Sequence, residues 1–366
     1  MQKINKINVV IVLLVLGLCV FGLVMIYSAS SYSALARYGD KWYFVKKQAV
    51  GLLLGVVLFV VAYNFDYHIF VKIKWLVIAL SVVALLLVFV PGIGISANGA
   101  RRWIGFASLN LQSSELAKFG FVIFASCYLS KNYDKMKTFL GLVPVLASGG
   151  IICVLILLEP NMSVTMCVGF VMVLMLLVGG IKLKHFIMLA VPAILLVPLL
   201  IIVEPYRLAR LTAFLNPWQN PMDEGYQLIQ SLYSLGAGGL FGVGLFNSRQ
   251  KYLFLPFSES DFIFSIIGEE LGFVGAVIVI LTYLTVVLLG VKIALKAKDR
   301  LGTYLAFGIV AVIATQVLIN IAVVTGSIPP TGIPLPFVSA GGTSVSICMG
   351  AIGVLCNVGK RFDSVS

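Results

Sequence analysis

Long runs of apolar residues, separated by short polar segments, make up most of the chain. A helix needs about 20 mostly apolar residues to cross a membrane. This length predicts ten membrane-spanning helices within one domain, residues 1–366. The predicted spans are 8–28, 47–64, 74–91, 115–131, 138–158, 162–181, 185–203, 264–291, 303–326 and 342–359. We therefore expect an all-α, polytopic integral membrane protein.

Three of the segments between the predicted spans are long: 92–114, 204–263 and 327–341. The largest, 204–263, separates the seventh and eighth spans. Within it, residues 225–235 have apolar positions at helical spacing, which predicts a short amphipathic helix at the membrane interface. Residues 327–344 contain four prolines and three glycines. This composition excludes a regular helix and predicts a fixed wall that lines a cavity.

The composition agrees with a membrane protein, because 60% of the residues are hydrophobic and 11% are charged. So few polar side chains cannot cover a soluble fold, which excludes a soluble enzyme or a nucleic-acid-binding protein. The net charge is +12, but the basic residues form short clusters between apolar runs. Fifteen lie in the segments on the side of the termini, and ten lie in the longer opposite loops. We expect both termini to be cytoplasmic and the three long segments to lie outside.

Two common kinds of cofactor site are not expected from the sequence. It contains no GxxxxGK[ST] loop, and no predicted cytoplasmic segment is long enough for a nucleotide-binding domain, so no nucleotide is expected. The six cysteines lie inside apolar runs, and the two histidines are far from any cysteine cluster that could complete a zinc site.

Several charged residues stand out because they lie in or beside apolar spans. Asp261 lies where a polar loop meets a span, and it is either an ordinary helix cap or part of a site. Glu269 enters that span, where an unpaired charge at the bilayer centre costs roughly 2.5–3.5 kcal/mol. Glu115 and Lys118 are spaced to form an ion pair, which either braces the bundle or belongs to a site. Arg101 is either an interfacial anchor or a contact for an anionic, lipid-linked ligand.

Three motifs, in this order along nearly the whole chain, resemble those of the SEDS family (shape, elongation, division and sporulation). They are Gly99 to Ile104 with Gln112 to Lys118; Gln250-Lys251 with Leu255-Pro256 and Asp261 to Gly272; and Thr331 to Phe337 with Ser339, Gly341 and Gly342. The chain departs from the family pattern in three places. Ser113 replaces the usual proline, no acid directly follows Pro256, and Glu159-Pro160-Asn161-Met162-Ser163 replaces the commoner Gln-Pro-Asp-Leu-Gly.

The resemblance implies a peptidoglycan glycosyltransferase that polymerises lipid II at the outer face of the bacterial cytoplasmic membrane. It implies a class B penicillin-binding transpeptidase as partner, other divisome, elongasome or sporulation proteins beside it, and no nucleic acid. It makes Asp261 the catalytic carboxylate. The residues that it suggests for substrate binding are Lys47, Arg101, Gln112, Glu115, Lys118, Lys251, Glu269, Ser339 and Gly341. A divalent cation, Mg²⁺ or Mn²⁺, is expected without assigned ligands, and the 98–103 motif favours the FtsW and SpoVE type.

Two other functions fit a polytopic chain with buried ions: a transporter or flippase for lipid II, and a non-catalytic scaffold of the cell-wall synthesis complex. A transporter is disfavoured because the two halves show no internal repeat. The polar segments also gather at one membrane face, which suits chemistry at that face. A scaffold would make Asp261 dispensable.

Overall fold

The computed structural model describes residues 5–97, 100–106, 109–202, 205–219, 221–223 and 225–360. These residues form twelve α-helices and a small three-stranded sheet. The helices are α1 (Lys6–Tyr38), α2 (Tyr43–Asn64), α3 (Ile69–Leu87), α4 (Ser113–Lys131), α5 (Phe139–Leu158), α6 (Met162–Val178), α7 (Leu183–Ile202), α8 (Pro205–Leu215), α9 (Tyr226–Gly238), α10 (Ile263–Lys296), α11 (Arg300–Val324) and α12 (Gly342–Gly359). The chain is therefore mostly helical, as predicted.

A helix occupies each of the ten predicted spans, and among the described residues seven helices are long and apolar enough to cross a membrane: α1, α2, α3, α5, α10, α11 and α12. The first helix is longer than its apolar run. It begins after Asn5, whose side chain accepts a hydrogen bond from the Ile7 amide, and ends at Gly39 in the left-handed conformation. Its extension beyond the apolar run buries Ser30, Ser33 and Ala34, so packing sustains the helix there.

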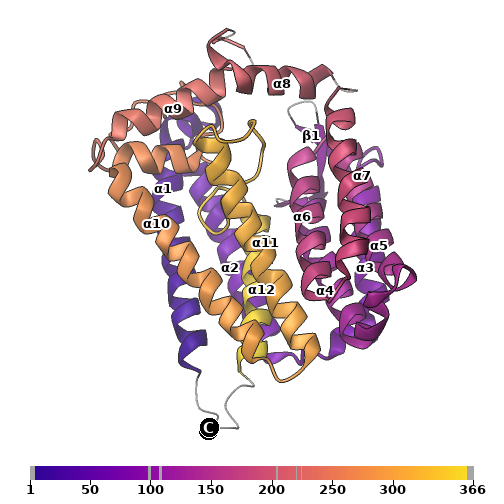
Figure 1. Cartoon of the computed structure of the whole chain (residues 1–366). Helices are drawn as coiled ribbons and strands as arrows, with labels where there is room; N and C mark the ends of the chain where they lie inside the picture. The colour runs from indigo at the N-terminus through magenta and orange to yellow at the C-terminus, as the bar shows by residue number, and fades with distance from the viewer. Residues whose placement is uncertain are drawn as a thin grey trace.

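The helices form one bundle with two distinct ends (Figure 1). Helix α8 crosses one end, between α7 and α9, while the described ends of the chain meet at the other. There the Asn5 amide donates to the Gly359 carbonyl at 2.7 Å. Helices α2 and α12 pack backbone to backbone, because a Cβ at Gly51 would lie 2.3 Å from the Cα of Gly342. Small residues allow this close approach between helices in a membrane.

The small sheet corrects the prediction of an all-α chain. It consists of β1 (Gly94–Ala97), β2 (Ala100–Phe106) and β3 (Leu109–Gln112), paired antiparallel in that order. Strand β3 leads directly into α4. Strands of four to seven residues carry too little hydrophobic alternation to reveal themselves in the sequence. Asn98 and Gly99 of the first motif lie outside the described residues.

The segment predicted as a long loop, 204–263, contains α8 and α9, with Glu204, Asn220 and Glu224 outside the described residues. Helix α9 confirms the short helix predicted at 225–235. After α9 the chain returns onto α10 and fills a break in that helix at Gly272, where φ is 68°. The freed amide of Phe273 donates to the Gly239 carbonyl at 2.9 Å, and the Val243 amide donates to the Glu269 carbonyl at 2.9 Å. The interruption is thus satisfied by protein.

Candidate active site

A cavity of about 1120 Å³ opens at the end of the bundle that α8 crosses. Its walls come from distant parts of the chain: the ends of α1 and α2, the sheet, the start of α6, α8, and the segments before α10 and α12. The charged residues that line it, among those that the structure describes, are Arg37, Lys47, Arg102, Arg210, Glu259 and Asp261. These four cations against two acids favour an anionic ligand.

Asp261 lies in the turn before α10, and hydrogen bonds fix its backbone. The side-chain amide of Asn320 on α11 donates to the carbonyls of Asp261, at 2.8 Å, and of Ile333, at 2.7 Å. The Ser339 hydroxyl donates to the Ser260 carbonyl at 2.6 Å. The segments of the second and third motifs are therefore joined directly, and the backbone that carries the carboxylate is held from both sides.

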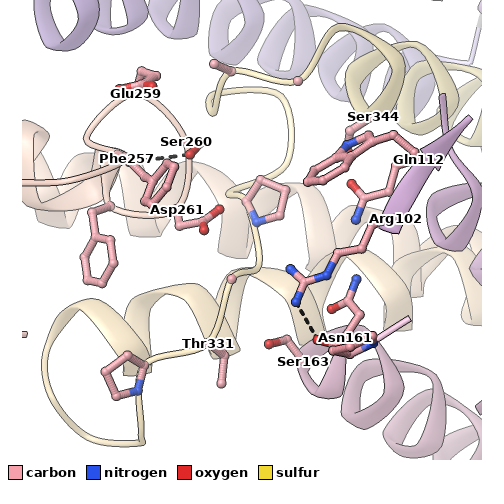
Figure 2. Close-up of a pocket in the computed structure, with 18 of the residues that line it drawn as sticks. Arg102, Gln112, Asn161, Ser163, Phe257, Glu259, Ser260, Asp261, Thr331 and Ser344 are labelled. Carbon is pink, nitrogen blue, oxygen red and sulfur yellow. Dashed lines mark hydrogen bonds between the residues drawn. The ribbon is translucent and has the colours of Figure 1, made fainter. Parts of the chain in front are cut away.

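The Asp261 side chain is half-buried and points into the cavity (Figure 2). Burial raises the pKa of Asp261 to about 6; the nearby charges of Arg102 and Arg210 partly offset this rise, while Glu259 adds to it. Among the described residues, no side chain donates a hydrogen bond to this carboxylate. A carboxylate with a pKa near 6 and open lone pairs is suited to act as a general base near neutral pH.

The proline-rich segment forms the wall beside Asp261, as the sequence predicts. Pro329, Pro330 and Pro334 line the cavity. A Cβ added at Gly332 would lie 3.1 Å from Oδ2 of Asp261. A side chain at this position would require the carboxylate to shift by a few tenths of an ångström.

The arginine that faces Asp261 is Arg102, whereas Arg101 is exposed and does not line the cavity. Arg102 extends from β2 toward the turn between α5 and α6 (Figure 2). Its Nε donates to the Glu159 carbonyl at 3.2 Å, and its Nη2 donates to the Pro160 carbonyl. Consecutive side chains leave a strand on opposite faces, so the fold decides which of two adjacent arginines enters the site.

Three other residues suggested from the sequence also line the cavity: Lys47, Gln112 and Gly341. Lys47 is held at the mouth, because its Nζ donates to the Tyr43 hydroxyl at 2.6 Å. Gln112 lies opposite Trp103 in the β2–β3 pairing. Ser339 does not line the cavity and instead fixes the Asp261 turn from behind.

Glu115 and Lys118 form a sealed ion pair behind the cavity wall. Their side chains are 0% and 1% exposed, and Lys118 Nζ lies 2.6 Å from Glu115 Oε1. The second oxygen of Glu115 accepts a hydrogen bond from Ser344, which does line the cavity. Among the described residues, the pair's hydrogen-bonded link to the cavity is Ser344, a geometry that favours a bracing role.

Glu269 and Lys251 belong to a separate polar cluster between α9, α10 and α1. Ser248 donates to Glu269 at 2.6 Å, and Lys251 Nζ lies 3.1 Å from Glu270 Oε1. Ser28 of α1 also donates to Glu270, at 2.6 Å. Neither Glu269 nor Lys251 lines the cavity. Their contacts close the break in α10 and hold the segment before Asp261.

Sequence reasoning missed several residues that line the cavity: Arg37, Asn161, Ser163, Arg210 and Glu259. Arg210 is the most informative of them, since it reaches in from α8 and donates to the Pro330 carbonyl at 3.0 Å. A pair of arginines in an otherwise apolar short segment, Arg207 and Arg210, could have indicated this site from the sequence. No comparable pattern marks Arg37, because the extension of α1 that carries it depends on packing.

Comparisons with known proteins agree with this architecture. Residues 9–363 match the FtsW, RodA and SpoVE family, described as cell cycle proteins. The chain is 38% identical to a protein of Geobacter sp. (strain M18) named "Probable peptidoglycan glycosyltransferase FtsW", with 99% of each chain covered. It is 39% identical to "Stage V sporulation protein E" of Bacillus subtilis (strain 168), with 96% of this chain and 97% of the relative covered.

Two solved structures share the fold. One is described as "Structural coordination of polymerization and crosslinking by a peptidoglycan synthase complex"; the match has a TM-score of 0.80 and 25% identity, over 97% of this chain and 98% of the other. The second, the rod shape determining protein RodA of Thermus thermophilus, has a TM-score of 0.71 and 23% identity, over 97% of each chain. The chain therefore belongs to the FtsW, RodA and SpoVE family of cell cycle proteins.

Proposed function

We propose that this protein is a peptidoglycan glycosyltransferase that polymerises lipid II into glycan strands, in cell division or sporulation. The names of the FtsW and sporulation relatives support this activity. The observation that carries the proposal is the position of Asp261: this carboxylate accepts no hydrogen bond from a described side chain, and it faces a cavity whose described lining includes four cations. That arrangement pairs a base with a binding site for an anionic leaving group.

The proposed reaction is an inverting displacement. The 4-hydroxyl oxygen of an acceptor sugar attacks the anomeric carbon of the donor, and the bond from that carbon to the polyprenyl pyrophosphate oxygen breaks. Asp261 accepts the hydroxyl proton, a role that contributes roughly 10²–10⁴-fold to such reactions. The electron pair of the broken bond leaves with the pyrophosphate. No water is consumed, so the paired carboxylates of a hydrolase are not required.

The cations of the cavity suit the pyrophosphate. Arg102 and Arg210 are close enough to lower the pKa of Asp261, so their positive charge reaches the reacting centre. Arginine binds phosphate oxygens through a planar fork of donors, and positive groups stabilise the charge that develops on the leaving group. Lys47, at the mouth, is suited to guide the anionic headgroup inward.

The proposal includes a divalent cation, but not one that protein side chains hold by themselves. Among the described residues, no group of three His, Cys, Asp or Glu side chains could hold a metal. The donor set does not fit a metal cage made of protein alone. It does fit Mg²⁺ held by pyrophosphate oxygens and water with one carboxylate, Asp261, nearby. Such an ion would supply further charge stabilisation for the leaving group.

The proposed orientation places the cavity at the outer face of the bacterial cytoplasmic membrane. The opposite end of the bundle carries the clustered basic residues of the short loops, such as Lys135, Lys182 and Lys298, which favours the cytoplasmic side. We propose that α4, α6 and α7 also cross the membrane and bring the number of spans to ten. An even number agrees with the contact between Asn5 and Gly359, and both termini are then cytoplasmic.

A transpeptidase is the proposed partner. One structural relative is described as a synthase complex that coordinates polymerization and crosslinking. Glycan strands made at the outer face must be crosslinked there, so a class B penicillin-binding protein is the expected enzyme of the second step. Other divisome, elongasome or sporulation proteins would assemble around this pair.

The test is a polymerisation assay with the protein and its transpeptidase in vesicles, lipid II and Mg²⁺. The parent protein is expected to form glycan chains, and Asp261→Asn is expected to reduce their rate by roughly 10²–10⁴-fold while it remains folded. Asp134→Asn, which changes an exposed carboxylate at the opposite end of the bundle, is the matched control.

The same assay separates the two other functions. Translocation of lipid II by a parent protein that makes no glycan would establish the flippase. An Asp261→Asn protein that supports cell-wall synthesis as well as the parent would establish a scaffold. Normal polymerisation by Asp261→Asn would show that the base is another group.

A further inference from the structure

The turn between α5 and α6 contains a buried carboxyl group that the proposed reaction does not use. Glu159 is 0% exposed and ends α5. One of its side-chain oxygens accepts a hydrogen bond from the Ser113 hydroxyl at 2.9 Å, and the other, Oε2, has no hydrogen-bond partner among the described residues. A buried polar atom without a hydrogen-bond partner lowers the stability of the fold, so a functional reason for its presence is worth seeking.

The same turn is the support of Arg102. The guanidinium of Arg102 donates to the backbone carbonyls of Glu159 and Pro160, and Pro160 lines the cavity. The next residue, Asn161, caps α6 with its side chain. Two backbone acceptors in fixed positions restrict a guanidinium to one orientation, and Figure 2 shows that this orientation faces the cavity and Asp261.

Two contacts join this turn to the unit formed by the sheet and α4. The Glu159 carboxyl binds Ser113, the first residue of α4, and Arg102 reaches across from β2. Strand β3 pairs with β2 and continues into α4, so both contacts bridge the same two parts of the protein. Removal of the Glu159 side chain breaks one contact and loosens the carbonyls that the other depends on.

We propose that Glu159 is a positioning residue of the active site: its buried carboxyl anchors the α5–α6 turn to α4 and so orients Arg102 toward the leaving group. This inference rests on the proposed glycosyltransferase function. Glu159 does not touch the cavity, so it acts on the reaction through Arg102. A neutral form matters, because an ionised carboxylate would compete with the pyrophosphate for the charge of Arg102.

The groups around the Glu159 carboxyl support the neutral form. Burial raises the pKa of Glu159 to about 8, against the lowering effects of the Ser113 hydroxyl and the Arg102 charge. Arg102 faces it from β2, and Ser113 faces it from α4. Glu115 follows in the first turn of α4, where it is paired with Lys118. The carboxyl is thus neutral at pH 7 and ionises as the pH rises through 8.

The experiment compares the pH profile of glycan polymerisation for the parent, Glu159→Gln, Glu159→Ala and the control Asp134→Asn. The glutamine is neutral at all pH values and still accepts from Ser113, so it is expected to stay within about twofold of the parent at pH 7. Between pH 7 and 9 the parent and the control are expected to lose about tenfold in kcat, since about nine-tenths of the carboxyl is ionised one unit above its pKa. Glu159→Gln is expected to keep its rate.

Glu159→Ala loses the anchor and is expected to fall by about tenfold in kcat at pH 7, with a smaller change in KM. The proposal is overturned if Glu159→Gln shows the same alkaline loss as the parent, or if folded Glu159→Ala polymerises at the parent rate. If Glu159→Ala does not fold, the pH profile of polymerisation by Glu159→Gln is sufficient to test the proposal.

Infrared spectroscopy gives a second readout that does not depend on glycan formation. The difference spectrum of the parent minus Glu159→Gln at pH 7 is expected to show the carbonyl band of a protonated carboxyl, and this band is expected to vanish by pH 9. Its absence at pH 7 overturns the neutral Glu159 even if the parent makes no glycan. A parent that makes no glycan but shows the band contradicts the proposed function and leaves the neutral carboxyl established.

Discussion

Asp261 and Glu115 are both acids in a very apolar chain, yet the fold gives them opposite environments. Glu115 is fully buried, and its two oxygens bind Lys118 and Ser344. Asp261 is half-buried, faces the cavity and accepts no hydrogen bond from the described side chains. The first acid has its partners built into the protein, and the second keeps its lone pairs for a ligand. Among the charges of a membrane protein, therefore, the incompletely paired ones indicate the chemistry.

The largest expected effect comes from breaking the sealed pair. Lys118→Met leaves the Glu115 carboxylate buried without its cation, which is expected to cost roughly 3–5 kcal/mol of stability. The double variant Glu115→Gln with Lys118→Met removes both charges and is expected to recover most of that loss. Thermal unfolding in detergent or nanodiscs measures both. Equal losses of stability in the single and double variants would show that the pair stabilises the fold by more than neutralising its own buried charges.

The two adjacent arginines allow the comparison to be sharpened within one strand. Arg102→Ala removes a guanidinium that faces Asp261, and it is expected to slow polymerisation roughly 10–100-fold, since a hydrogen bond to a charged group contributes about 1.5–3 kcal/mol. Arg101→Ala changes an exposed side chain and is expected to stay within about twofold. A larger loss of polymerisation rate for Arg101→Ala than for Arg102→Ala would contradict this orientation of β2.

The acid limb of the pH profile tests Asp261 itself. The base works only when ionised, and burial raises its pKa to about 6, so polymerisation is expected to increase as the pH rises through 6. At pH 5 the rate should be about tenfold below its plateau. Single-turnover glycan formation measures this. A rate that is constant from pH 5 to 7 would contradict a base with this pKa.

The smallest expected effect is a gain in stability. The pKa of Asp261 is higher in the folded protein than in an unfolded chain, so ionisation of Asp261 opposes folding. This cost is absent below about pH 3 and complete above about pH 7. Asp261→Asn is therefore expected to stabilise the protein on the order of 1 kcal/mol at pH 7.5 and not at pH 3. The unfolding temperatures of the parent and the variant at the two pH values test this prediction. A variant that is less stable than the parent at pH 7.5 would contradict this environment for Asp261.

The sequence predicted the apolar helices and the three motifs well, because length and hydropathy largely determine membrane spans. It suggested Arg101, whereas Arg102 lines the cavity, because the orientation of β2 decides which of the two side chains enters. It also grouped Glu269 and Lys251 with Asp261, although the fold places them in a different cluster. Charges that are close in sequence separate when the chain turns between them, and only tertiary packing fixes that turn.

Arg210 illustrates the same limit from the other direction. It enters the cavity because α8 crosses the end of the bundle, a position that depends on the contacts of α7 and α9. Its neighbours in the sequence give no indication of the proline-rich segment that it touches, 120 residues later. Long-range contacts of this kind, which the local sequence does not reveal, assemble the site.

The interruption of α10 at Gly272 has a consequence for biosynthesis. Peptide groups exposed to lipid at such an interruption cost several kcal/mol each, so the helix is a poor candidate for insertion by itself. The groups that satisfy it belong to residues 239–244, which the ribosome makes first. We therefore expect α10 to enter the bilayer with this earlier segment already beside it. Residues 239–244 would then supply the hydrogen-bond partners that the following helix needs at its interruption.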